Sequence, residues 1–289
     1  MSNKLLMQPD WWTHSSRSWQ ELSDFFSIGH LSVKTNWRHL AKGQSNYNYQ
    51  FLYPDKGITK SYFVQIINSE NQKLLPQVNQ PPIIKRLTDY PWLNQWLVDC
   101  YLNTNRVRIF PWVNSLPITS ETLAQPFLSM LGKFLIRLHS EKNTFNTHSQ
   151  LPVIDIDSHL QRYRKLALEN SPQSANQIDL YYRESKKLTR NFIASHLCHN
   201  DLSPNNILWN NISLELKIID WEYACYSDVV MDIANLIINF GLNKQQEKNL
   251  IKLYSEQIGL KIPPLKLSKM KQLCQYISIL WRLSSFKSN

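Results

Sequence analysis

The sequence is poor in glycine and cysteine, and it lacks any long hydrophobic run. With six glycines among 289 residues, any glycine-rich nucleotide loop must be short. The four cysteines are scattered and form no CxxC pair, which is typical of reduced core residues in a cytosolic protein. No apolar run reaches the roughly 18 residues that a membrane-spanning helix needs, and the first residues lack the apolar core of a signal peptide. We therefore expect a cytoplasmic protein without a membrane partner.

Positive charge is in excess and lies mainly near the C-terminus. The net charge is +10, and residues 240–289 carry +7 of it through nine Lys and Arg and two Glu. A basic balance is compatible with nucleic acid, acidic membranes or phosphate ligands. No zinc-finger spacing or aromatic RNA-binding signature accompanies the charge. We therefore expect no nucleic-acid partner and interpret the basic stretch as a solvated helix face.

The pattern of apolar residues changes along the chain. Residues 31–67 are rich in Val, Ile, Tyr and Phe and are interrupted by turn signals, which predicts three antiparallel strands. Residues 96–102 and 106–112 have the composition of two further strands. After Pro117 apolar residues recur at helical spacing, which predicts helices as far as the C-terminus, interrupted by one strand over residues 215–220.

These elements predict an α+β fold with two lobes and a cleft between them. A hydrophobic content of 43% is sufficient for a substantial core in a chain of this length. The expected domains are residues 1–100, a small and mainly antiparallel β N-lobe that binds nucleotide, and residues 101–289, a larger helical C-lobe with the catalytic loop and the acceptor site.

The segment His199–Trp209, HNDLSPNNILW, concentrates polar residues between apolar flanks. Asp201 lies at its centre, Asn206 follows five residues later, and a predicted strand then leads to Asp220. Mg²⁺ prefers hard oxygen ligands, usually one or two carboxylates together with substrate phosphates. Asn206 and Asp220 could supply two such oxygens if the strand folds back beside the loop. Asp201 would then be free to orient a substrate hydroxyl and accept its proton.

Turn formation and helix capping are the alternative interpretation of Asp201 and Asn205, because a few polar residues at a fixed spacing often occur by chance. The downstream segment KIIDWEYA is a second, independent match, since a strand that ends in Asp220 follows the loop at a kinase-like distance. The two matches together favour phosphoryl transfer, in which a metal ion neutralises phosphate charge and a carboxylate positions the attacking hydroxyl.

The motifs HNDLSPNN, IDWEYA and DIANL closely resemble those of the aminoglycoside phosphotransferase and choline kinase superfamily. The form IDWEYA is most similar to the choline kinase and bacterial thiamine kinase branch, and LGKFLIRLHS resembles the family's helix that ends in Leu-x-x-Leu-His. The resemblance covers residues 96–242 well and residues 31–67 weakly. It implies a bilobal protein-kinase-like fold that phosphorylates small hydroxyl substrates, with Mg²⁺ as cofactor and ATP as co-substrate, GTP being possible.

In the C-lobe the resemblance implies a role for each motif residue. Asp201 matches the catalytic base, and Asn206 and Asp220 match the two metal ligands. His199 matches a histidine that braces the loop, which is also the usual role of a lone buried histidine. Asp232 matches an acidic residue that ties the following helix to the catalytic loop, and a helix N-cap is the alternative.

The expected acceptor site combines one carboxylate with aromatic side chains. Glu222 matches a residue that lines the acceptor pocket in the choline kinase branch, and Trp281 lies on the C-terminal helix with Tyr276 and Phe286. Such a combination suits a cationic head group through cation–π contact. Packing in the core is the alternative interpretation of these aromatic residues, because they recur at helical spacing.

In the N-lobe the motif GQSN resembles the family's short phosphate loop, so Ser45 and Asn46 are candidate nucleotide ligands; a simple hairpin turn is the alternative. In the next strand Gln65 aligns with the Lys or Arg that grips the nucleotide phosphates, and a neutral amide would lose that charge-assisted contact. Asp99 and Tyr101 fall on a segment that resembles the hinge strand, whose backbone meets adenine.

These matches predict an ATP-dependent phosphotransferase, a monomer or homodimer, that acts on the hydroxyl of a small amine-bearing molecule, thiamine or choline first. An aminoglycoside-type kinase is one alternative, although the basic C-terminal stretch argues against a polycationic acceptor. A catalytically degenerate, kinase-like binding protein is another. The neutral Gln65 and the lack of a clear helix with a Glu partner favour that alternative, whereas the intact Asp201, Asn206 and Asp220 oppose it.

Overall fold

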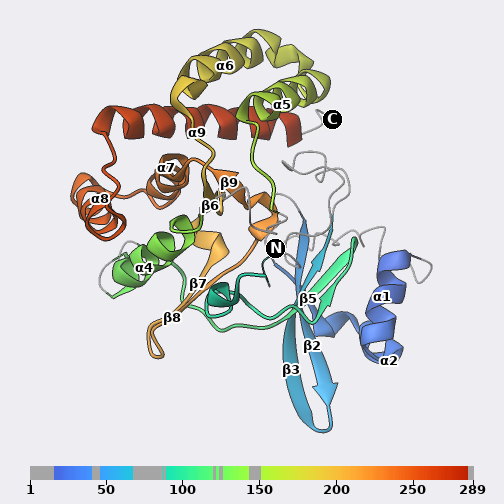
Figure 1. The fold of residues 1–289 in the computed structure, drawn as a ribbon. Helices are drawn as coiled ribbons and strands as arrows, with labels where there is room; N and C mark the ends of the chain where they lie inside the picture. Colours follow the sequence, from blue (N-terminus) through green and yellow to red (C-terminus); the bar gives the residue numbers. More distant parts are fainter. Residues whose placement is uncertain are drawn as a thin grey trace, which may run out of the picture. The chain divides into compact units, whose positions relative to one another are not determined.

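The structure, a computed structural model, describes residues 16–40, 46–67, 87, 89–119, 122–123, 126–142 and 151–285 (Figure 1). These residues form two compact units. The first contains the described residues up to 67 together with Val98–Val113, and the second contains those from 87 to Leu97 and from Asn114 onward. Among the described residues, no helix combines the length and the apolar composition that crossing a membrane requires.

A five-stranded antiparallel sheet forms the centre of the first unit, with the strand order β1-β2-β3-β5-β4 (Figure 1). The strands β2 and β3 are joined by a tight turn at Lys56 and Gly57, which both have positive φ, as a two-residue hairpin turn of this hand requires. The bounds of the elements in this unit are α1 (Arg17–Phe25), α2 (Ile28–Leu31), η2 (Lys34–Asn36), β1 (Trp37–His39), β2 (Tyr47–Asp55), β3 (Ile58–Ile66), β4 (Leu102–Asn103) and β5 (Val107–Pro111).

One face of this sheet carries the hydrophobic core of the first unit. Alternate residues of a strand point to the same face, and Phe51, Val64 and Ile109 are fully buried there. They belong to one cluster with Trp19 and Leu22 of α1, which lie three residues apart and therefore on one side of that helix. The helix α1 thus covers the apolar face of the sheet.

The opposite face carries a row of polar residues that crosses four strands. Asn48 of β2 is paired with Gln65 of β3, and Gln65 is paired with Arg108 of β5. Arg108 is in turn paired with Asn103 of β4. Residues directly opposite each other in antiparallel strands have their side chains on the same face. We call these four residues the polar row.

Helices make up most of the second unit. The helices α5 and α6 both pack against α9, the longest helix described, and α7 contacts α9 from another side (Figure 1). Leu160 and Tyr163 of α5 and Leu280 of α9 form the buried contact between these helices. The bounds of the helices are α4 (Phe127–His139), α5 (Ile156–Asn170), α6 (Ala175–Leu188), α7 (Val229–Asn239), α8 (Lys244–Ile258) and α9 (Pro264–Ser285).

Two short antiparallel strand pairs, β6 with β9 and β7 with β8, lie within the second unit. The bounds of these strands are β6 (His196–Cys198), β7 (Ile207–Asn210), β8 (Glu215–Ile218) and β9 (Cys225–Ser227). The 3-10 helices of this unit are η4 (Pro91–Leu93), η5 (Pro172–Ser174), η6 (Thr189–Asn191), η7 (Pro204–Asn206) and η8 (Trp221–Tyr223).

The α+β class and the strands expected within residues 31–67 and 106–112 are confirmed. The strand expected over residues 96–102 is wrong, because only its last residue belongs to a strand, β4. Trp96 instead lies in the second unit, where its ring packs edge-on against Phe134 and its carbonyl accepts a hydrogen bond from Ile218 N–H at 2.7 Å. The expected domain boundary after residue 100 also differs from the observed division, in which β4 and β5 belong to the first unit.

Candidate active site

Residues 199–206, which we call the catalytic loop, begin with a sharp turn after β6. Asn200 has a φ of 64°, a left-handed conformation that Asn tolerates better than most residues. Its side-chain amide donates to the Tyr223 carbonyl at 3.1 Å, and its own carbonyl accepts from Asn235 Nδ2 of α7 at 2.9 Å. These two hydrogen bonds fix the direction in which the chain enters the loop.

Within the loop, the amide of Asn206 holds the carboxylate of Asp201. Asn206 Nδ2 donates to Asp201 Oδ2 at 2.9 Å and to the Asp201 carbonyl at 2.8 Å. Burial raises the pKa of Asp201 to about 7 even though the hydrogen bond from Asn206 lowers it, and the negative charges of Glu222 and Asp232 add to the rise. Asp201 therefore changes its protonation state near neutral pH, where a general base is most effective.

The hairpin of β7 and β8 brings Asp220 back to the catalytic loop. Ile207 is paired with Ile218, and Ile219 N–H donates to the Asn206 carbonyl at 3.0 Å. Asp220 then adopts a φ of 61°, a left-handed conformation that turns the chain out of the strand. The strand thus folds back beside the loop, which is the condition for Asn206 and Asp220 to share a metal ion.

His199 connects the loop to the same hairpin. Its Nε2 lies 3.0 Å from the Ile219 carbonyl, which can only accept, so Nε2 carries the hydrogen. Its Nδ1 accepts from the Asp201 backbone N–H at 3.3 Å. Burial lowers the pKa of His199 to about 4, although the charge of Asp232 and the Ile219 carbonyl act in the opposite direction. The neutral ring therefore braces the loop, as the sequence suggested, and does not titrate near neutral pH.

Asp232 fastens α7 to the catalytic loop. Its carboxylate is fully buried and accepts from His199 N–H at 3.0 Å, from Asn200 N–H at 2.8 Å and from His139 Nε2 at 3.0 Å. Burial alone would raise the pKa of Asp232, but the hydrogen bond and charge of His139 outweigh it, and the pKa is lowered. The N-cap alternative is wrong, because Asp228 caps α7.

Glu222 lies between two aromatic residues, Trp221 and Tyr223, on η8. It is only 6% exposed. Tyr223 Oη accepts from Trp281 Nε1 at 3.0 Å and is also hydrogen-bonded to the side chain of Tyr163 on α5. Trp281 is partly buried and packs against the cluster between α5, α6 and α9, so it has a structural role as well. Of the two other aromatic residues expected with it, Tyr276 has its ring tilted against that of Tyr181, with the ring centroids 5.5 Å apart. Phe286 lies outside the described residues.

The candidate phosphate ligands of the nucleotide belong to the first unit. Asn46 is buried, whereas Ser45 lies outside the described residues. Gln65 is buried within the polar row. Its Nε2 donates to Asn48 Oδ1 at 3.3 Å, and its Oε1 accepts from Arg108 Nη1 at 2.9 Å. A basic side chain therefore lies directly against the position at which the sequence lacks one.

The expected hinge residues Asp99 and Tyr101 lie at the edge of the sheet of the first unit. Both residues precede the edge strand β4, and Tyr101 N–H donates to the Ile109 carbonyl at 2.8 Å, so this donor is already used within the sheet. The strand that the chain follows before it leaves the sheet for the second unit is β5. Adenine binding by the backbone at Asp99 and Tyr101 stays a prediction.

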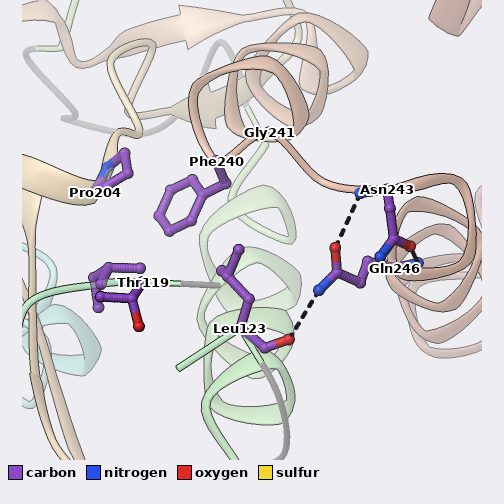
Figure 2. Close-up of a pocket in the computed structure, with 8 residues that line it drawn as sticks. Thr119, Leu123, Pro204, Phe240, Gly241, Asn243 and Gln246 are labelled. Carbon is purple, nitrogen blue, oxygen red and sulfur yellow. Dashed lines mark hydrogen bonds between the residues drawn. The ribbon is translucent and has the colours of Figure 1, made fainter. Parts of the chain in front are cut away.

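A cavity of about 340 Å³ lies beside Pro204 of the catalytic loop (Figure 2). On one side Gln246 of α8 accepts from Asn243 N–H at 2.9 Å and donates to the Leu123 carbonyl at 3.2 Å. The lining residues are Ile118, Thr119, Leu123, Pro204, Phe240, Gly241, Asn243 and Gln246. None of the candidate base, metal or acceptor residues is among them, so this cavity is separate from the candidate active site.

Sequence reasoning missed several residues of the site. Tyr223 could have been found, because it stands next to Glu222 in the motif IDWEYA. His139, which ends the motif LGKFLIRLHS, could likewise have been assigned to Asp232. Tyr163 lies on α5, outside all of the motifs, so no local signal marks it. Arg108 gives no signal until the strand register is known.

Comparison with known proteins agrees with this geometry. The family model described as choline/ethanolamine kinase matches residues 38–260. A protein named LicA homolog from Metamycoplasma hominis is 31% identical over 172 residues, which cover 59% of this chain and 64% of that protein. The chain thus spans less than two thirds of the length of that curated relative.

Solved structures resemble the chain over most of its length. The choline kinase LicA from Streptococcus pneumoniae has a TM-score of 0.70 at 20% identity and covers 92% of this chain and 90% of its own. An ethanolamine kinase from Plasmodium vivax has a TM-score of 0.64 at 16% identity, with 89% and 79% covered. These structures confirm a protein-kinase-like fold. Because the family model extends from β1 to the end of α8, the chain belongs to the choline/ethanolamine kinase family.

Proposed function

We propose that this protein transfers the γ-phosphoryl group of ATP to the hydroxyl group of choline. The observation that carries the proposal is the joint placement of three residues by the catalytic loop and the β7–β8 hairpin. Asn206 holds the carboxylate of Asp201 at 2.9 Å and is itself held through its carbonyl by the strand that leads to Asp220. A base and two oxygen ligands are thereby fixed relative to one another.

Asp201 is the proposed base. With a pKa raised to about 7 by burial, a large fraction of the carboxylate is ionised at neutral pH. Its Oδ2 is oriented by Asn206 Nδ2, which leaves the other carboxylate oxygen to accept the proton of the substrate hydroxyl. The hydroxyl oxygen then bonds to the γ-phosphorus, the bond between the β–γ bridging oxygen and that phosphorus breaks, and ADP leaves.

Asn206 and Asp220 fit a Mg²⁺ ion by their chemistry. Both hydrogen bonds from the Asn206 side chain use its amide nitrogen, so the amide oxygen faces away from Asp201. An amide oxygen and a carboxylate are ligands that Mg²⁺ accepts together with phosphate oxygens. When bound there, the ion would neutralise charge on the transferred phosphoryl group.

The acceptor site is proposed around Glu222. Its buried carboxylate lies on the same short helix as Tyr223, which Trp281 and Tyr163 hold by hydrogen bonds. A carboxylate with aromatic faces suits a quaternary ammonium group, which offers positive charge but no hydrogen-bond donor. The relative named as a choline kinase supports choline over thiamine. The basic stretch of residues 240–289 disfavours a polycationic aminoglycoside.

The proposal is tested by ADP release with ATP and Mg²⁺ in the presence of choline, ethanolamine, thiamine or kanamycin. Choline is expected to give the highest kcat/KM, and removal of Mg²⁺ with EDTA is expected to stop the reaction. Asp201→Asn serves as the matched inactive control. Turnover with another acceptor but not with choline would contradict the proposed substrate, and ligand binding without any turnover would identify a kinase-like binding protein instead.

We further propose that the protein is cytoplasmic and acts as a monomer or homodimer on this small molecule alone. All four cysteines are free thiols in the structure, which suits a reducing compartment. Size-exclusion chromatography with light scattering measures the oligomeric state directly, and a mass above that of a dimer would contradict the expectation.

A further inference from the structure

We propose that Arg108 on β5 is the cation that binds the nucleotide phosphates, in place of the Lys or Arg that the family resemblance assigns to the position of Gln65. This inference rests on the proposed function, because it assumes that the first unit binds ATP. It moves the phosphate-binding charge from one strand to its neighbour in the same sheet.

The strand register places the two positions side by side. Gln65 and Arg108 are directly paired across β3 and β5, and Arg108 Nη1 donates to Gln65 Oε1 at 2.9 Å. Side chains that are directly opposite in an antiparallel pair have Cβ atoms about 5 Å apart. A guanidinium on a long side chain can therefore reach the region that a cation at position 65 would occupy.

Arg108 also lies on the polar face of the sheet, where its side chain is buried beside Gln65. The other face is filled by the apolar cluster with α1, which includes Val107 and Ile109, the neighbours of Arg108 on either side. The polar row forms the face on which Arg108 lies. At one end of the row, both side-chain atoms Oδ1 and Nδ2 of Asn103 are buried and have no hydrogen-bond partner in the part of the chain that the structure describes.

The neutral side chain at position 65 has a physical reason in this arrangement. A Lys there would place a second positive charge against the charged guanidinium of Arg108. Gln instead offers an oxygen that accepts from Nη1 and an amide nitrogen that donates to Asn48. Gln65 is therefore a positioning residue, which holds one arm of the guanidinium. The planar, charged guanidinium has a geometry suited to phosphate oxygens.

Isothermal titration calorimetry with ATP, ADP and adenosine, in the presence of Mg²⁺, tests the role of Arg108. Arg108→Gln is expected to weaken the binding of ATP and ADP by about 10- to 100-fold and that of adenosine by less than about twofold, because only the nucleotides carry phosphate. The matched control is Arg106→Gln, since Arg106 pairs with Glu21 of α1 at 2.8 Å. Equal affinities for ATP in Arg108→Gln and wild type, or equal weakening for all three ligands, would overturn the inference.

A second variant decides the question even if Arg108→Gln does not fold. If the polar row lacks a phosphate-binding cation, Gln65→Lys would supply one and tighten ATP binding. If Arg108 already supplies it, Gln65→Lys is expected to leave ATP binding unchanged or to weaken it, with adenosine binding unaffected. Tighter ATP binding by Gln65→Lys would therefore refute the role of Arg108. A wild type that binds none of the three ligands would refute the proposed function and this inference together, whereas the outcomes above refute the inference alone.

Discussion

Replacing Asp201 by Asn should make the folded protein more stable while it removes activity. Burial disfavours the charged form of this carboxylate and raises its pKa from an ordinary value of 3.8 to about 7. An Asn side chain has nearly the same shape, carries no charge, and still offers an oxygen to Asn206 Nδ2, the donor that now lies 2.9 Å from Asp201 Oδ2. Loss of the base should lower turnover by about 10²- to 10⁴-fold.

The size of the stability gain follows from proton linkage. Between pH 4 and pH 7 the folded protein binds a proton at Asp201 that the unfolded chain has released, so wild-type stability falls as the pH rises through this window. Each unit between the pKa values of Asp201 in the folded and unfolded states corresponds to about 1.4 kcal/mol. Above pH 7 the ionised carboxylate therefore lowers the free energy of unfolding by about 4 kcal/mol. Because Asp201 is partly exposed to solvent, we expect the substitution to raise the free energy of unfolding by only about 1–3 kcal/mol.

Urea unfolding at pH 4 and pH 8 in EDTA measures this effect without a metal ion that would compensate the charge. The two proteins should have similar unfolding free energies at pH 4, and Asp201→Asn should be the more stable at pH 8. Asp179→Asn is the control, because that carboxylate is 54% exposed and paired with Arg164 on the surface, and it should change stability by less than about 0.5 kcal/mol. An Asp201→Asn protein that is less stable than wild type at pH 8 would refute the reasoning.

Three further predictions concern the neighbouring carboxylates. Asp220→Ala should lower kcat by at least about 100-fold because a metal ligand is lost, and wild-type turnover by the folded variant would contradict the metal site. Glu222→Gln should raise the KM for choline about tenfold, the equivalent of 1.4 kcal/mol, and leave the KM for ATP nearly unchanged; parallel changes in both would remove Glu222 from the acceptor site. Asp232→Asn should destabilise the fold by about 3 kcal/mol in urea unfolding, since three hydrogen bonds converge on this buried carboxylate, and a loss below about 1 kcal/mol would mean that Asp232 does not hold the loop.

The catalytic loop and its hairpin could be predicted because their information is local. His199, Asp201 and Asn206 lie within one loop between two strands, and Asp220 follows at the end of the next strand. A strand, a short turn and a second strand fold back on each other wherever the chain is continuous and the register is set by an apolar pattern. The approach of Asp220 to Asn206 therefore follows from a short segment of sequence.

The remaining parts of the site depend on contacts between distant residues. Gln65 and Arg108 are 43 positions apart and become neighbours only through the order of the strands in the sheet. The segment around Trp96 fits a strand pattern, but Trp96 is buried because it packs against Phe134 and the β8 backbone within the second unit. A short apolar run has the same composition in both situations, so sequence alone does not separate them.

In the proposed mechanism, the side chain at position 206 meets two opposite requirements with a single planar group. One end must donate to the carboxylate and carbonyl of Asp201, and the other end must remain an oxygen that can face a cation. Asp at this position would place a carboxylate oxygen against the Asp201 oxygens, which also only accept. Gln would move the amide one carbon further from the backbone. Ser has a single oxygen, whereas both a donor and a separate acceptor are needed. Fewer residues can therefore replace Asn206 than Asp201 without disturbing the loop. At position 201, Asn preserves the shape of the loop and alters only the chemistry.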